Sequence, residues 1–168
     1  KCTTLGGMFV NCSSMTSIDI SSFVTDHVIN MERLFSGCSK LSSLNLGASF
    51  NTVYAESLSQ MFMDCASLTS LDLSGFDTRD VKDFSSMFKG CTSLENLDIS
   101  SFSFMHAEKW GSILYDCTKM KNLNLGSKIG DNWEYWDVYH LANVSQNCAI
   151  HCSPAAMNNL LTISCIAD

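Results

Sequence analysis

The sequence predicts a right-handed α/β solenoid, in which one short unit of structure is repeated and stacked. The main observation is a series of five cysteines spaced 26, 27, 26 and 26 residues apart: Cys12, Cys38, Cys65, Cys91 and Cys117. A second observation is that the apolar residues around each cysteine stay in the same phase from copy to copy. Periods of about 20 to 30 residues are typical of solenoids, whose units contact only their neighbours.

Apolar residues set the register of the five copies, which we number one to five in the order of these cysteines. Copy one begins at Met8-Phe9 and copy three at Met61-Phe62. Copies two and five each contain one extra residue after an Asn-Leu-Gly sequence, where we expect a turn. Two columns of residues are predicted to face the core: Ile18, Leu44, Leu71, Leu97 and Leu123 in the first, and Ile20, Leu46, Leu73, Ile99 and Leu125 in the second.

Each copy combines a strand pattern with a helix-like pattern. The run 71–73 is apolar, polar, apolar, which is the period of a strand with one buried face. Asp77-Thr78 then resembles a helix N-cap. The apolar residues that follow have offsets of three, three, one and three, as on one face of a short α or 3₁₀ segment: Val81, Phe84, Met87, Phe88 and Cys91. We therefore expect a parallel sheet on one face of the stack and short helical segments on the other.

Copy three reads Met-Phe-x-x-Cys-x-Ser-Leu-x-x-Leu-Asp-Leu-Ser-x-Phe-Asp-Thr over residues 61–78. This string resembles the repeat of BspA-like leucine-rich-repeat surface proteins of bacteria, and is closest to a branch best known from lipoproteins of unknown function. The resemblance covers about residues 2–130. It implies a leucine-rich-repeat solenoid that is displayed on a cell surface or secreted, often linked to adhesion and host attachment, and it supplies no catalytic residues.

We expect a single structural domain with five tandem repeats at 1–130 and a cap at 131–168. The chain is expected to start in the middle of a repeat, as a piece of a longer precursor, because Cys2 and Leu5 match the columns of Val81 and Phe84. An exposed first repeat would leave a core edge that something must cover.

Aromatic residues mark the predicted C-terminal cap. Trp133, Tyr135 and Trp136 either cover the end of the core or form a sugar- or partner-binding platform. Ser153-Pro154 then predicts the start of a short closing helix, because serine suits the N-cap and proline the first helical position.

The periodic cysteines are predicted to be buried free thiols, because a cysteine at a fixed inward position behaves as a small apolar side chain. Cys148, Cys152 and Cys165 fall outside the period, and one disulfide among them is an alternative. With His140 and His151 nearby, a zinc site is a further alternative, but this spacing is a weak ligand pattern and no metal site is predicted.

Composition excludes several classes of function. A net charge of −7 argues against a nucleic-acid partner, which needs a basic face. No apolar stretch approaches 18 residues, so no transmembrane segment is predicted in this piece. Catalytic and nucleotide-binding fingerprints are missing from the sequence, and neither an enzyme nor a cofactor is predicted. His27 and His106 occupy a variable position and are expected at the surface.

Small polar residues occupy the outward face of the predicted strands. One interpretation is a solvated hydrogen-bonding ladder, and the other is a shallow acidic groove that binds glycan hydroxyls, a cation or a basic peptide. As a hypothesis, Asp72 and Asp98 on adjacent copies share a proton or a cation. The candidate ligand-binding residues are Asp19, Asn45, Asp72, Asp98 and Asn124, with Ser70 and Asn96 beside them.

The sequence thus predicts a non-catalytic leucine-rich-repeat module, on a bacterial cell surface or outside the cell, for adhesion or ligand binding. Its expected partner is a host or matrix protein or a glycan, and its oligomeric state is left open. The alternative is a structural spacer or stalk of a larger surface protein. A hydrolase is a third hypothesis, which no motif favours.

Overall fold

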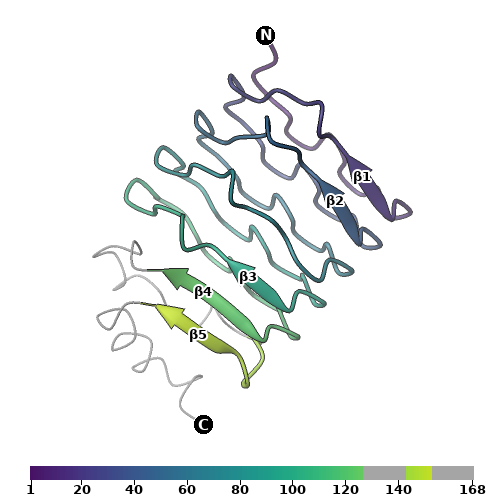
Figure 1. The fold of residues 1–168 in the computed structure, drawn as a ribbon, viewed down its shortest axis with the longest axis vertical. Helices are drawn as coiled ribbons and strands as arrows, with labels where there is room; N and C mark the ends of the chain where they lie inside the picture. The colour runs from purple at the N-terminus through teal and green to yellow at the C-terminus, as the bar shows by residue number, and fades with distance from the viewer. Residues whose placement is uncertain (127–142, 153–168) are drawn as a thin grey trace.

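The strands of successive copies lie side by side along the length of the molecule (Figure 1). The structure, a computed structural model, describes residues 1–126 and 143–152. Described residues near the N-terminus form one end of the stack, and strand β5 lies towards the other end (Figure 1). Four sets of predictions lie outside the described residues: the aromatic cap at Trp133, Tyr135 and Trp136, the closing helix from Ser153, Cys165 and His140.

In the described residues, the sheet side of the stack has five short parallel strands in two sheets. Strand β1 (Ser17–Asp19) pairs with β2 (Ser43–Asn45), and β3 (Asn96–Asp98) pairs with β4 (Asn122–Gly126), which pairs with β5 (Ala149–Cys152). Ile18 lies opposite Leu44, and Leu97 opposite Leu123. This register confirms the alignment of the predicted repeats, and with it the repeat fold and the parallel sheet. The right hand of the coil stays a prediction.

The two predicted inward columns form much of the core. Leu97 and Leu123 have exposed fractions of 2% and 0%, and Ile99 and Leu125 are fully buried. Three members of the columns are only half-buried, namely Leu44, Leu46 and Leu71. These three belong to neighbouring copies, so the departure from a closed core is confined to one place.

The prediction of short α or 3₁₀ segments on the other face is wrong. No helix occurs among the described residues, and the segment from Val81 to Cys91 is a series of turns. Two residues of this segment have positive φ, 56° at Ser86 and 74° at Gly90, and each described copy repeats this pair. A helix requires negative φ at every position, so these residues prevent one.

Alternation of two hydrogen-bond patterns explains why this side resembled a helix in the sequence. Met87 N–H donates to Phe84 O at 3.1 Å, and Cys91 N–H to Phe88 O at 3.1 Å, which are turns of three-residue spacing. Other N–H groups between them donate to the next copy, as Phe88 does to Ile113 O at 2.9 Å and Gly90 to Tyr115 O at 2.8 Å. The turns therefore give apolar offsets of three without a helix.

The threonine that resembled part of an N-cap has a different role. Thr78 Oγ1 accepts the Ser103 N–H at 2.7 Å and donates to Ser103 O at 3.2 Å. Thr25 makes the same pair of bonds to Asn51, each at 2.7 Å. Both threonines are buried, with exposed fractions of 1% for Thr78 and 2% for Thr25. The hydroxyl groups therefore join consecutive copies inside the core, where an unpaired backbone group would be costly.

Phenylalanines and cysteines form two ladders on the turn side. The rings of Phe35 and Phe62 are stacked with centroids 5.5 Å apart, and those of Phe62 and Phe88 with centroids 5.7 Å apart. Cys91 Sγ donates to Phe62 O at 3.1 Å, and Cys65 makes the equivalent bond to Phe35 O at 3.2 Å. The prediction of buried free thiols is confirmed for Cys38, Cys65, Cys91 and Cys117, whereas Cys12, in the first copy, is only half-buried.

Strand β5 is a sixth rung that the sequence reasoning did not foresee. It lies 27 residues after β4, with Ile150 opposite Leu123. The register shifts between Asn124 and Gly126. Ile150 and Cys152 pack against the core, so the alternation that marks the other strands is present here too.

Candidate binding face and cleft

The central outward column lies on the exposed face of the sheet, as predicted. Asp19, Asp72 and Asp98 are exposed, and each accepts a hydrogen bond from the backbone N–H two residues later. The acceptor distances are 2.9, 3.0 and 2.9 Å respectively. Hydrogen bonds from Ser21, Ser74 and Ser100 are the main cause that lowers the pKa of these three carboxyls below the ordinary value of 3.8. The three aspartates are therefore ionised at neutral pH and held in fixed directions.

Asparagines link the aspartates of neighbouring copies. Asn45 Nδ2 donates to Asp19 Oδ2 at 3.1 Å, and Asn124 Nδ2 donates to Asp98 Oδ2 at 3.1 Å. In the adjacent column Asn122 Nδ2 donates to Asn96 Oδ1 at 2.7 Å. Neutral amides thus separate most of the negative charges along the face.

The hypothesis that Asp72 and Asp98 share a proton stays a prediction, and the direction of the pKa shifts of the two carboxyls does not favour it. A shared proton would raise the pKa of one of the two carboxyls, whereas hydrogen bonding lowers both. A bound cation at this pair has no further support, since residues 1–126 and 143–152 contain no group of three His, Cys, Asp or Glu side chains arranged to hold a metal ion.

A cleft interrupts the face between copies two and three. Its volume is about 450 Å³. The side chains of Leu44, Leu46 and Leu71, whose columns face the core in the other copies, are partly exposed there. The lining residues come from the two copies in similar number: Leu44, Asn45, Leu46, Gly47, Ala48 and Phe50 from copy two, and Leu71, Asp72, Ser74, Gly75 and Phe76 from copy three.

The cleft coincides with the break between the two sheets. Residues 70–73 form no strand, and in the part of the chain that the structure describes no backbone hydrogen bond joins them to β2. Towards copy four the ladder resumes, because Ser70 is bridged to Asn96 and Glu95 N–H donates to Thr69 O at 3.0 Å. The break is therefore one-sided, between copies two and three.

Asp72 differs from the other aspartates of its column because it lies in this cleft. Asn45 Nδ2 is already bonded to Asp19, and the next residue of the column is Asp98 rather than an asparagine. Oδ1 of Asp72 accepts from the Ser74 N–H, and no asparagine of a neighbouring copy is recorded as a donor to Oδ2, among the described residues. Asp72 thus offers, at the edge of the cleft, an ionised carboxylate that is not linked to a neighbouring copy.

The remaining predicted site residues are placed as follows. Ser70 and Asn96 lie opposite each other on adjacent copies, both exposed. Cys148 and Cys152 are free thiols, so they do not form a disulfide with each other. The prediction of surface histidines is confirmed: His27 and His106 are exposed, and the His27 ring stacks on Tyr54 at 6.3 Å.

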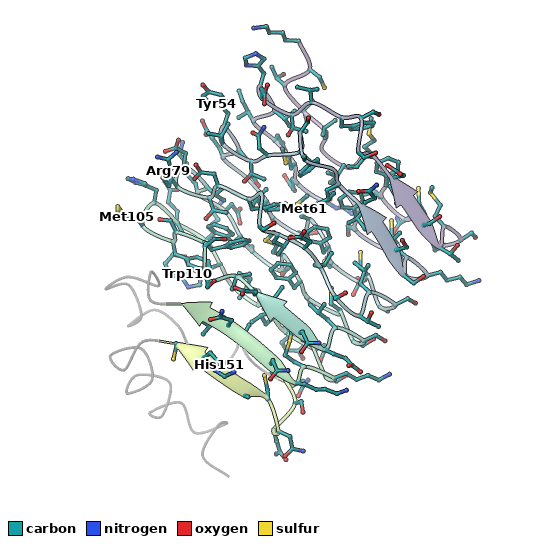
Figure 2. The ribbon with its side chains drawn as sticks, viewed as in Figure 1. Tyr54, Met61, Arg79, Met105, Trp110 and His151 are labelled. Atoms are coloured by element: carbon teal, nitrogen blue, oxygen red, sulfur yellow. The ribbon has the colours of Figure 1, made fainter. Side chains whose placement is uncertain are left out.

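Sequence reasoning missed the cleft, although one signal pointed to its position. The extra residue of copy two lies in the segment from Gly47 to Phe50, which forms part of the cleft wall. The stick view places Tyr54, Arg79 and Met105 along one edge of the coils, on the side towards which the strand arrows point (Figure 2). Within 1–126 and 143–152 no helix has both the length and the apolar character required to cross a bilayer.

Residues 3–129 match the family described as "Mycoplasma protein of unknown function, DUF285". A leucine-rich repeat protein from Bacteroides ovatus ATCC 8483 has a similar structure, with a TM-score of 0.54 and 23% identity over 88% of this chain. The match covers 33% of the Bacteroides chain. The T. pallidum leucine-rich repeat protein (TpLRR) is similar with a TM-score of 0.52 and 14% identity, over 97% of this chain and 75% of its own. No curated protein matches the sequence. At these identities the structural likeness shows the leucine-rich-repeat fold alone.

Proposed function

The chain belongs to the family described as Mycoplasma protein of unknown function, DUF285, and is a BspA-like leucine-rich-repeat protein. From this premise we propose that it is a non-catalytic ligand-binding solenoid at a bacterial cell surface. It is either displayed there or secreted. Its ligand is a host or matrix protein or a glycan, bound on the outward face of the sheet.

The observation that carries this proposal is the face itself. Asp19, Asn45, Asp72 and Asp98 are exposed, and the backbone register repeats from copy to copy. A parallel sheet spaces equivalent side chains about 4.8 Å apart, so one type of contact can recur along an extended ligand. Each contact is weak, but several in series give useful affinity.

The chemistry of the face favours binding over catalysis. Its carboxyls have pKa values below 3.8, so they are ionised throughout the neutral range. General acid–base catalysis near pH 7 requires a group whose pKa lies near that pH. Ionised carboxylates next to amides suit hydrogen bonds to hydroxyl groups and contacts with basic side chains.

The experiment that tests the proposal is a binding screen against arrays of glycans and purified extracellular-matrix proteins. The 168-residue chain is compared with an Asp72→Lys/Asp98→Lys variant, which reverses the charge of the face. Placing like charges against a matched ligand is costly, so we expect binding to weaken by at least about tenfold.

The matched control is Asp80→Lys/Glu108→Lys. These exposed residues lie outside the outward column, and the variant changes the net charge by the same amount. Loss in the face variant with retention in the control supports the proposal. Equal loss in both variants assigns binding to net charge, and binding to nothing in the screen favours the spacer or stalk instead.

A further inference from the structure

We propose that the cleft between copies two and three binds an extended peptide that carries a lysine or arginine side chain. This inference rests on the proposed function, because it names the place on the outward face where recognition is concentrated and the chemistry of the ligand. Three features of the cleft support it: free backbone groups, accessible apolar side chains, and one carboxylate that is not linked to a neighbouring copy.

The first feature is the interrupted hydrogen-bond ladder. Parallel strands direct the N–H and C=O of alternate residues to opposite neighbours. Copy two pairs with copy one through the backbone groups of Ser43 and Asn45. Ser43 N–H donates to Thr16 O at 3.2 Å, and Asn45 O accepts from Ile20 N–H at 2.9 Å. Leu44 and Leu46 therefore direct their backbone groups towards copy three, where among the described residues they find no backbone partner.

Copy three presents the complementary side of the same gap. By the same alternation Ser70 and Asp72 direct their backbone groups towards copy two, and no backbone bond crosses to β2 in the described part of the chain. An extended peptide offers N–H and C=O groups at the same spacing. Addition of a peptide to free strand edges is a common mode of recognition, in which the main chain supplies affinity.

The second feature is the apolar wall of the cleft. Leu44, Leu46 and Leu71 are half-buried, although the equivalent residues of copies four and five are nearly or fully buried: Leu97 and Leu123 in the first column, Ile99 and Leu125 in the second. Covering these side chains removes apolar surface from water, which favours an occupant with aliphatic side chains. Phe50 and Phe76 line the cleft but have exposed fractions of only 2% and 5%. The cleft therefore lacks an accessible aromatic face on which a sugar ring could stack, and a peptide is the better match.

The third feature is charge. Among the described residues Asp72 is the single charged residue that lines the cleft, and no amide of a neighbouring copy is recorded as a donor to its Oδ2. The chain has a net charge of −7, so a basic peptide is also attracted at longer range. A lysine or arginine of the peptide would complete the coordination of this oxygen, as Asn45 does at Asp19 and Asn124 at Asp98.

The test is an NMR titration of the ¹⁵N-labelled 168-residue chain with the blocked peptide acetyl-Thr-Val-Lys-Val-Thr-amide. We expect the amide signals of residues 44–50 and 70–76 to shift, and those of the β3–β4 face to stay in place. The peptide with glutamate in place of lysine should bind more weakly. Shifts that spread evenly over all copies, or that avoid the cleft, overturn the proposal.

The variant arm uses Asp72→Asn, which keeps an acceptor for the Ser74 N–H but removes the charge. We expect about fivefold weaker binding, the upper range for an exposed charge pair. Asp80→Asn is the control, because it makes the same change of charge at an exposed residue outside the cleft. Equal binding by the wild type and Asp72→Asn contradicts the assigned ion pair.

The two proposals fail in different ways. Peptide shifts on the β3–β4 face with none in the cleft refute the cleft proposal, whereas a glycan or matrix protein can still bind the outward face. If the array screen gives binding that the face variant does not affect, the proposed function fails even where the peptide shifts the cleft. Titration with a xylose or glucose oligomer that moves the same amides without charge dependence refutes the peptide and assigns the cleft to sugars.

Discussion

The two sides of the stack differ at one junction, between copies two and three. On the turn side the hydrogen bonds cross this junction without interruption, as from Phe35 N–H to Met61 O at 2.9 Å and from Gly37 N–H to Met63 O at 2.8 Å. On the sheet side no backbone bond crosses it within the described residues. The turn side and the core therefore hold the copies together, and the sheet side can open without separating them.

Burial accounts for this difference. On the turn side the Phe and Cys ladders bury the backbone, and a buried N–H or C=O group without a partner is costly. Met61, Phe62 and Cys65 all have exposed fractions of 0%. On the outward face, water can replace a missing ladder partner at small cost. A binding cleft on the sheet side is thus compatible with a stable stack.

The largest expected effect on stability comes from truncating a leucine of the first inward column to alanine. We compare a position in the paired sheet with the equivalent position beside the cleft. Leu97→Ala removes a side chain that is 2% exposed in the paired sheet, and we expect a loss of about 2–5 kcal/mol in the free energy of unfolding. Leu71→Ala removes a half-buried side chain beside the cleft, and roughly half that loss is expected. Urea denaturation followed by circular dichroism measures both. Equal losses would mean that the cleft is closed in solution.

A second prediction probes the continuity of the turn side. Gly90 has a φ of 74°, and a Cβ atom there would overlap Asp64 Oδ1 of the preceding copy. We expect Gly90→Ala to cost about 2 kcal/mol, because a non-glycine residue in the left-handed region is strained and Asp64 must also move. Thermal or urea unfolding provides the measurement.

Its control is Gly111→Ala. A Cβ at Gly111 meets no atom within 4 Å, and its φ is not in the left-handed region. This substitution is expected to be neutral or slightly stabilising, since it restricts the unfolded chain. The double variant Asp64→Ala/Gly90→Ala should recover part of the loss. No recovery would show that strain alone, and not contact between copies, is responsible.

The sequence predicted the repeat and most of the core because both depend on burial, which the apolar periodicity records. Leu97, Ile99 and Leu125 are buried as the columns require. The helical face was predicted wrongly because turns of three residues and a short helix give similar apolar offsets. Positive φ at serine, glutamine and arginine, as at Ser86 and Gln60, leaves no composition signal comparable to glycine.

The outward column could also be predicted, because strand alternation fixes which side chains point away from the core. The cleft could not. Copies two and five both have an extra residue, yet β5 still pairs with β4 after copy five, with a register shift between Asn124 and Gly126. The difference between the two copies lies in pairing across copies, which a local pattern does not record.

A third prediction concerns the thiols of the turn side. Burial raises the pKa of Cys65 and of Cys117 to about 12, and raises that of Cys91 well above 9.0. A folded pKa above the unfolded value means that the protonated thiols stabilise the fold fully below pH 9. This contribution is lost as the pH rises from 9 towards 12.

The measurement is urea denaturation under reducing conditions at pH 7.5, 9 and 10. Stability should fall above pH 9, and Cys65→Ala should fall less steeply over the same range. Alkylation with iodoacetamide at pH 8 supplies an independent check, since exposed Cys2 should react in the native state and Cys91 should not. Rapid alkylation of Cys91 without unfolding would show that the turn side opens as the sheet side does.

The smallest expected effect distinguishes the aspartates inside and outside the cleft. Hydrogen bonds to Ser74 and Ser100 lower the pKa of Asp72 and Asp98 below 3.8, so their contribution to stability is present above that pH and is lost as the pH falls through the folded values. A ¹³C NMR titration of the carboxyl signals measures both. Asn124→Ala should raise the pKa of Asp98, which loses an Nδ2 donor at 3.1 Å, and leave that of Asp72 unchanged. The peptide with lysine should lower the pKa of Asp72 alone, because Asp72 lines the cleft and, unlike Asp98, receives no hydrogen bond from an asparagine of the next copy. If the peptide instead lowers both values equally, its charge acts on the whole face, and the cleft has no special role in recognition.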